Sequence, residues 1–172
     1  MQFQIAVCDD EARDRERIVQ MTEDLLQSER IPYSIISFAS GRELLSAIQG
    51  GDRFHLLLLD VMMEEMDGME LAAAIREQQN RTSIVFISTN REMALRGYEV
   101  SAARYLAKPV EEEKLQEALI YCHNVWLEKR EILLSSTKGQ CRIRFSEIQY
   151  VEAFERGTRI VLVIEAIETK LK

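Results

Sequence analysis

The chain has 172 residues, with 22 lysines and arginines against 29 aspartates and glutamates, and a net charge of −7. This length suits one ordinary domain, or one domain and part of a second. The acidic excess lies in residues 1–130, which hold 15 basic and 23 acidic residues and are therefore poorly suited to binding nucleic acid. Residues 131–172 hold 7 basic and 6 acidic residues, so their charge does not exclude such binding.

The three cysteines, Cys8, Cys122 and Cys141, are scattered along the chain and form no CxxC pair. An odd, scattered set argues against a disulfide framework and favours a reducing compartment. Acidic residues at 9–11 interrupt the first apolar run, which argues against a signal peptide, and no apolar stretch approaches the ~20 residues that span a bilayer. We therefore expect a cytoplasmic protein without a membrane partner.

The first part of the chain alternates between short apolar runs and amphipathic segments. Ser40 with Glu43, and Asp67 with Glu70, have the spacing of a capping box at the start of a helix. Five strand–helix units predict an α/β fold with a five-stranded parallel, doubly wound sheet. Strands are predicted at 3–8, 33–38, 54–60, 83–88 and 103–106, and helices at about 12–28, from 40, from 67, near 91–98 and from 111.

The third predicted strand is a run of four leucines that stops at Asp60. In an open parallel sheet, ligands bind beyond the carboxyl ends of the strands, so Asp60 is expected at the sheet rim. Taken alone, this aspartate is more simply a cap for the next turn. The interpretation changes because polar residues also end three other strands: Asp9 and Asp10, Ser88, and Lys108.

This set of side chains suits phosphoryl transfer. Three carboxylates form an oxygen-rich site for Mg²⁺, which neutralises the charge of a phosphoryl group. Asp60 is the predicted nucleophile, whereas Ser88 would donate a hydrogen bond to one phosphoryl oxygen and Lys108 would pair with another. Pro109 is expected to fix the turn that holds Lys108 in place.

The set Asp9-Asp10, Asp60, Met63, Asp67-Gly68, Ser88 and Lys108-Pro109 resembles the receiver domain of two-component response regulators. The resemblance covers residues 1 to about 127 and implies a flavodoxin-like fold. It implies that a sensor histidine kinase phosphorylates Asp60, and that the backbone carbonyl of Met62 joins the three aspartates in binding Mg²⁺. Such a domain is a phosphoacceptor and not an enzyme, with at most self-catalysed phosphorylation and dephosphorylation.

The same resemblance implies that Ser88 and Tyr105 reorient on phosphorylation, and that the face of the fourth helix, fifth strand and fifth helix forms a homodimer. Two positions depart from the family pattern. Glu64 stands where the family usually has proline, which puts the rigidity of the metal loop in doubt. Thr89 stands where a small residue is usual, and is expected to narrow access to Asp60.

The pattern changes near residue 131, where short strands follow one another without a helix and predict antiparallel pairing. The Arg-rich strand, the segment 146–152 and the glycine turn after it resemble the start of a LytTR-type DNA-binding domain. We therefore predict a receiver domain at 1–127, then a linker and an incomplete LytTR-type domain at 128–172. Arg142 and Arg144 are candidate DNA contacts, and are equally consistent with a solvated strand face.

About 40 residues of strand rarely close a core alone, so the tail is expected to belong to a larger domain and to self-associate. The leading hypothesis is a phosphorylation-switched transcriptional regulator that binds DNA through the complete output domain. The alternative is a receiver-type interaction module that signals through a protein partner, with the tail as a dimerisation element. An aspartyl-phosphate hydrolase is disfavoured, because such enzymes commonly have a second acid at the position of Met62.

Overall fold

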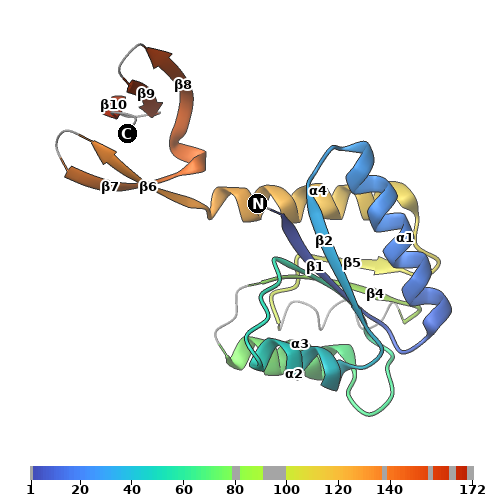
Figure 1. Ribbon diagram of the computed structural model, residues 1–172. Helices are drawn as coiled ribbons and strands as arrows, with labels where there is room; N and C mark the ends of the chain where they lie inside the picture. The colour runs from blue at the N-terminus through green and yellow to red at the C-terminus, as the bar shows by residue number, and fades with distance from the viewer. Residues whose placement is uncertain are drawn as a thin grey trace. The chain divides into compact units, whose positions relative to one another are not determined.

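The computed structural model describes residues 2–78, 82–90, 100–136, 139–154, 157–162 and 166–169. The chain divides into two compact units, Met1–His123 and Asn124–Lys172, and each has a sheet of its own (Figure 1). The predicted helix near 91–98 lies outside the described residues. Within the described part of the chain, no helix is long and apolar enough to cross a membrane.

The first unit contains a five-stranded sheet in the order β2-β1-β3-β4-β5. Every pair of neighbouring strands is parallel, so the chain has to cross over one face of the sheet between one strand and the next. This order is that of a flavodoxin-like receiver fold, and the fold predicted from the sequence is confirmed. The strands are β1 Phe3–Cys8, β2 Tyr33–Phe38, β3 Leu56–Asp60, β4 Ser83–Ser88 and β5 Arg104–Ala107.

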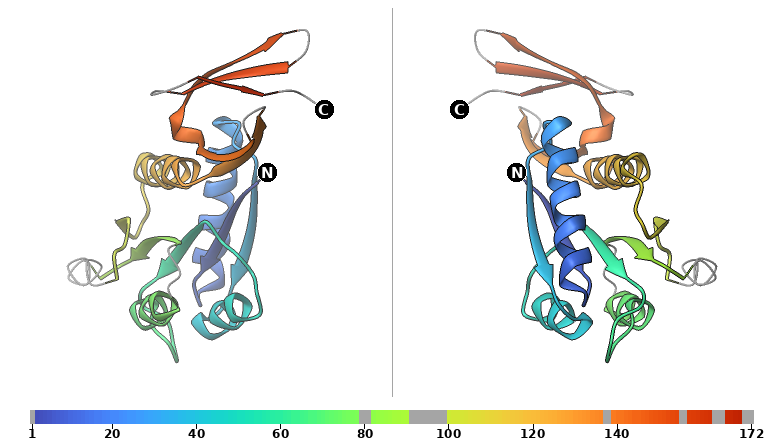
Figure 2. Two further views of the ribbon diagram at one scale, coloured as in Figure 1. Left: turned by 90° about the vertical axis from the view of Figure 1, so that its left-hand side faces the viewer. Right: turned by 90° about the vertical axis from the view of Figure 1, so that its right-hand side faces the viewer.

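Helices cover both faces of this sheet (Figure 2). Helix α1 and the first part of α4 lie on one face, whereas α2 and α3 lie side by side on the other. All five residues of β3 are buried, and Leu57 and Leu59 join the core beneath α2 and α3. Each such leucine contributes roughly 1.5–3 kcal/mol through burial. The helices are α1 Ala12–Ser28, α2 Gly41–Gln49, α3 Gly68–Glu77 and α4 Glu112–Glu128.

The predicted helix starts differ in detail. The capping box of α3 is complete, since the Asp67 carboxylate accepts from the Glu70 N–H and the Glu70 carboxylate accepts from the Asp67 N–H. At α2 the Ser40 hydroxyl accepts from the Glu43 N–H at 3.2 Å, but the Glu43 carboxylate accepts from the N–H of residue 39 instead. Helix α4 begins at Glu112, one residue later than predicted, and the Glu111 carbonyl accepts from the N–H of residue 115.

The second unit is a five-stranded sheet in the order β7-β6-β10-β9-β8 with antiparallel pairing throughout, as predicted. Strand β9 begins at Gly157, which pairs with Phe154, the last residue of β8. A short 3₁₀ helix, Phe145–Glu147, joins β7 to β8. The strands are β6 Glu131–Ser136, β7 Gly139–Arg144, β8 Ile148–Phe154, β9 Gly157–Leu162 and β10 Ala166–Thr169.

The second sheet exposes apolar side chains on strand β8. Tyr150 is 50% exposed and Val151 is 57% exposed. Successive residues of a strand point to opposite faces, so apolar groups are exposed on both faces of β8. On β6, Leu133 is also exposed, whereas Ile143 of β7 and Ile160 of β9 are buried. Among the described residues, this small sheet therefore leaves much apolar surface in contact with water.

Candidate functional site

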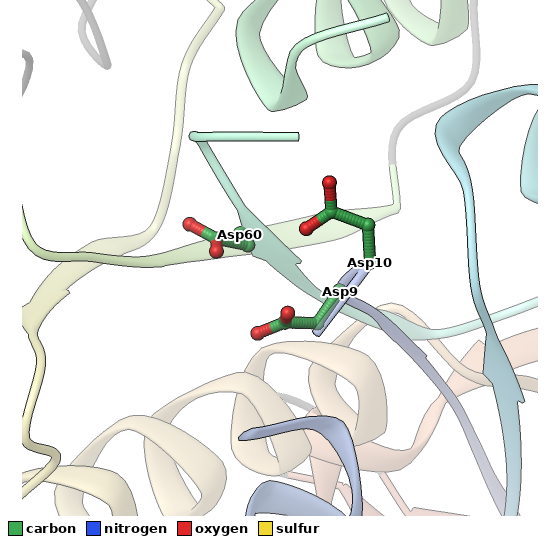
Figure 3. Close-up of side chains that lie close together, drawn as sticks. All are labelled: Asp9, Asp10 and Asp60. Carbon is green, nitrogen blue, oxygen red and sulfur yellow. The ribbon is translucent and has the colours of Figure 1, made fainter. Parts of the chain in front are cut away.

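Three carboxylates meet at the carboxyl edge of the first sheet (Figure 3). Asp60 is the last residue of β3, and Asp9 and Asp10 directly follow the neighbouring strand β1. Each of the three offers a carboxylate oxygen, and these oxygens all lie within 4.8 Å of one another. Asp9 and Asp60 are buried, at 3% and 6% exposure, and Asp10 is half-buried. The sequence therefore placed these three acids correctly at one rim.

The Lys108 ammonium group lies among carboxylates after β5. Its Nζ is 2.8 Å from Asp9 Oδ2 and 2.7 Å from Asp60 Oδ2. A third carboxylate, Asp14 Oδ2 on helix α1, lies 2.8 Å from the same nitrogen. Asp14 was missed by the sequence reasoning, although its place in the first turn of α1, soon after Asp9 and Asp10, is a signal that it lies near the rim. The Lys108–Pro109 peptide bond that leads away from the site is cis.

Burial and charge pairing act in opposite directions on the ionisable groups of this cluster. Burial raises the pKa of Asp9, although hydrogen bonding to Lys108 opposes that shift. Burial alone would lower the pKa of Lys108, but hydrogen bonds to Asp14, Asp60 and Asp9 outweigh it and hold this pKa above its ordinary value. Lys108 is therefore charged at neutral pH and offsets the repulsion among the acids.

Backbone N–H groups in the loop after β3 hold two of the rim carboxylates in place. The Met62 N–H donates to Asp60 Oδ1 at 3.0 Å, and the Glu64 N–H donates to Asp10 Oδ2 at 2.8 Å. The side of Asp60 that faces the loop is thus held by Met62, whose own side chain is exposed. Glu64, the departure from the family's proline, provides an N–H that proline does not have. The hydrogen bond to Asp10 ties the loop in place without proline.

The two predicted switch residues meet at Asn90. Ser88 is fully buried at the end of β4, and its hydroxyl accepts from the Asn90 N–H at 3.3 Å. The Tyr105 hydroxyl of β5 donates to the Asn90 carbonyl. Burial raises the pKa of Tyr105, and the Asp60 charge adds to the shift, while a hydrogen bond with Ser88 opposes it. The Lys108 N–H also donates to the Ser88 carbonyl at 2.9 Å, which connects Ser88 to the lysine loop.

Arg142 and Arg144 lie two residues apart on β7, in the second unit, and therefore on one face of that strand. The Arg142 guanidinium is 3.8 Å from the Glu131 carboxylate, and both side chains are exposed. The Arg144 backbone N–H donates to the Glu147 carboxylate at 2.9 Å. The role of these arginines in DNA binding stays a prediction.

Comparison with known proteins matches residues 5–120 to the response regulator receiver domain. The positive alginate biosynthesis regulatory protein of Pseudomonas aeruginosa is 33% identical over 117 residues, which cover 67% of this chain and 45% of that protein. The sensory transduction protein LytT of Bacillus subtilis is 32% identical over 91 residues, or 53% of this chain and 38% of that protein. The chain spans less than half the length of these two relatives.

Among solved structures, the chemotaxis response regulator CheY4 of Vibrio cholerae is similar to the first unit. The TM-score is 0.61 at 28% identity, with 71% of this chain and 99% of that chain covered. The C-terminal strands are consistent with the start of the output region of LytTR-type regulators. With the sheet order, the three rim aspartates and Lys108, the family match over residues 5–120 shows that this chain belongs to the response regulators and carries their receiver domain.

Proposed function

We propose that Asp60 accepts a phosphoryl group from a sensor histidine kinase, and that this controls a LytTR-type DNA-binding output that regulates transcription. The observation that carries the proposal is the Asp60 carboxylate at the end of a fully buried strand, paired with Lys108 and close to two further carboxylates. The names of two relatives, a regulatory protein and a sensory transduction protein, support it. A cytoplasmic location is supported by three free cysteines.

The proposed chemistry is nucleophilic attack by an Asp60 carboxylate oxygen on phosphorus. A new oxygen–phosphorus bond forms while the bond from phosphorus to the donor's leaving group breaks, and the leaving group keeps the electron pair. Lys108 stays charged and offsets part of the negative charge that arrives. The chain in this scheme is a phosphoacceptor and not an enzyme, since the phosphoryl group remains on Asp60 until water removes it.

The donor set at the rim fits Mg²⁺. Asp9, Asp10 and Asp60 offer oxygens within 4.8 Å of one another, and hard carboxylate oxygens are the ligands that this ion prefers. The Met62 carbonyl is the proposed fourth protein ligand. When bound, the ion would neutralise charge on the phosphoryl oxygens. The hydrogen bond from the Glu64 N–H orients Asp10 toward this role.

Millimolar Mg²⁺ is expected to raise the melting temperature of the chain by a few degrees. A ligand that binds only the folded state stabilises it by about 1.4 kcal/mol at ten times its dissociation constant. Asp10→Ala removes one proposed ligand and should abolish the shift, measured by thermal melting with and without Mg²⁺. Asp24→Ala, which removes an exposed carboxylate of α1, is the matched control and should keep the shift. An undiminished shift in Asp10→Ala would contradict the metal site.

Phosphorylation is proposed to act through Ser88 and Tyr105. Both side chains now bond to Asn90, so a Ser88 hydroxyl that turns toward a phosphoryl oxygen must give up its bond to the Asn90 N–H. Tyr105 bonds to the carbonyl of the same residue, which couples its position to that of Ser88.

Intact-mass measurement after incubation with acetyl phosphate and Mg²⁺ tests the proposed function. The chain should gain one phosphate, and no gain would contradict the proposal.

A second candidate is the receiver-type interaction module with the tail as a dimerisation element. It is favoured by the exposed apolar residues Tyr150 and Val151 on opposite faces of β8, and by exposed Leu133 on β6. Exposed apolar strand surface recruits further chains. Both candidates include a homodimer, so they differ in whether the output contacts DNA.

The 172-residue chain is expected to self-associate through residues 131–172, because these leave apolar side chains exposed. A chain that ends at Glu128 should be mainly monomeric and should still accept phosphate. Light scattering of both chains at equal concentration measures this. If the longer chain is a monomer at high micromolar concentration, the exposed strand faces are covered within one molecule and the tail is not a dimerisation element.

A further inference from the structure

We propose that Asp14 is the exchangeable partner of Lys108: it holds the lysine in the unphosphorylated chain, and the phosphoryl group displaces it. Asp14 then acts as a positioning residue that slows phosphorylation of Asp60. This inference rests on the proposed function of Asp60 as the phosphoacceptor.

The first step is the number of hydrogen bonds that Lys108 can make. A lysine ammonium group has three N–H donors. Three carboxylate oxygens, from Asp9, Asp60 and Asp14, lie 2.7–2.8 Å from Nζ. All three donors are therefore engaged, and a phosphoryl oxygen can pair with Lys108 only if one of these carboxylates withdraws.

The second step is which carboxylate leaves at the lowest cost. The side chains of Asp9 and Asp60 are only 4% and 6% exposed, whereas that of Asp14 is 34% exposed. A buried carboxylate that loses its partner stays without solvation, which is costly, while an exposed one is rehydrated. Asp9 is also held by the Glu11 N–H at 2.9 Å, and Asp60 by the Met62 N–H. Asp14 is thus the partner that exchanges.

The third step is the space that Asp14 needs. A cavity of about 240 Å³ lies beside the cluster and is lined by Asp14, Thr89 and Lys108, together with Arg17, Ile18, Pro109 and Val110. Asp14 lines this cavity and its side chain is 34% exposed, so its carboxylate has open space beside it when it leaves Lys108. The same cavity reaches Lys108, so the movement and the lysine share one solvent-accessible space.

The fourth step is the effect on rate. Asp14 adds a negative charge to a site that already holds the carboxylates of Asp9, Asp10 and Asp60, and phosphodonors are anionic. It therefore both occupies a donor that the phosphoryl group needs and repels the incoming anion. Asn at this position keeps the shape but accepts a weaker hydrogen bond, since the amide carries no charge.

Asp14→Asn is expected to speed phosphate uptake from acetyl phosphate with Mg²⁺ on the order of tenfold, measured by intact mass over time. The same substitution should lower the melting temperature without phosphodonor, because an ion pair with Lys108 is lost. A purely structural role would lower the melting temperature without raising the rate. Asp14→Glu, which keeps the carboxylate, should stay close to the unaltered chain in rate.

Glu16→Gln is the matched control, because Glu16 is an exposed acid on the same helix, two residues further on. It removes one negative charge and should leave the rate nearly unchanged. Equal acceleration in both variants would show general repulsion, and an Asp14→Asn rate at or below that of the unaltered chain would also overturn the exchange. If the unaltered chain gains no phosphate, both the proposed function and the exchange fail. Equal acceleration in both variants, or an Asp14→Asn rate that does not rise, overturns the exchange alone and leaves Asp60 as the acceptor.

Discussion

Asp60→Asn is expected to abolish phosphate uptake from acetyl phosphate. The amide oxygen of asparagine carries no negative charge and is a poor nucleophile toward phosphorus. Asp9 and Asp10 stay in place at the end of β1, where Lys108 pairs with Asp9 and the Glu64 N–H donates to Asp10. The measurement is intact mass after incubation with acetyl phosphate and Mg²⁺, in which the unaltered chain is expected to gain one phosphate.

The variant should fold, so its loss of uptake can be assigned to the chemistry. The substitution removes one of three clustered carboxylates, and Lys108 retains Asp9 and Asp14 as partners. Asp52→Asn, an exposed aspartate in the turn before β3, controls for the substitution itself and should leave uptake intact. One phosphate found on Asp60→Asn would show that another carboxylate is the acceptor.

The sequence predicted the first sheet well because burial determines its pattern. The four leucines before Asp60 form a strand whose every residue is buried. Such a run suits a strand covered on both faces, and parallel pairing then places Asp60 at the same rim as Asp9. The errors lie at element ends, as at Glu111, where a single hydrogen bond decides which residue begins the helix.

The site was predicted only in part, for a physical reason. Acids at strand ends are visible in the sequence because strand order and direction bring them together. The pairing of Asp14 with Lys108 depends on the path of a long side chain after β5, which no local spacing records. The bond from the Glu64 N–H to Asp10 is made by the backbone, so the identity of residue 64 gives no sign of it beyond the absence of proline.

Gly68→Ala is expected to be among the most destabilising single changes in the receiver unit. A Cβ at this position would overlap the Asp60 carbonyl oxygen and lie 3.0 Å from both the Asp60 carbonyl carbon and the Val61 Cα. All three are backbone atoms, so no side-chain rotation relieves the overlap. The Gly68 N–H also donates to the Val61 carbonyl at 3.0 Å, which holds the start of α3 against the end of β3.

Relief of the overlap must move α3 away from β3, and Leu71 and Ile75 of α3 are fully buried in the core. The expected loss is roughly 4 kcal/mol in the free energy of unfolding, the size that marks disruption of a core, or about 10 °C in melting temperature.

Gly50→Ala is the matched control, because its Cβ would lie no closer than 3.3 Å to the carbonyl oxygens of its own helix α2. The melting temperature of this variant should change little. Since the displaced atoms belong to Asp60, Gly68→Ala should also weaken the Mg²⁺-dependent rise in melting temperature, which Gly50→Ala should keep. Equal melting temperatures for the two variants would mean that β3 and α3 can move apart without loss of stability. The close approach of Gly68 would then not position Asp60.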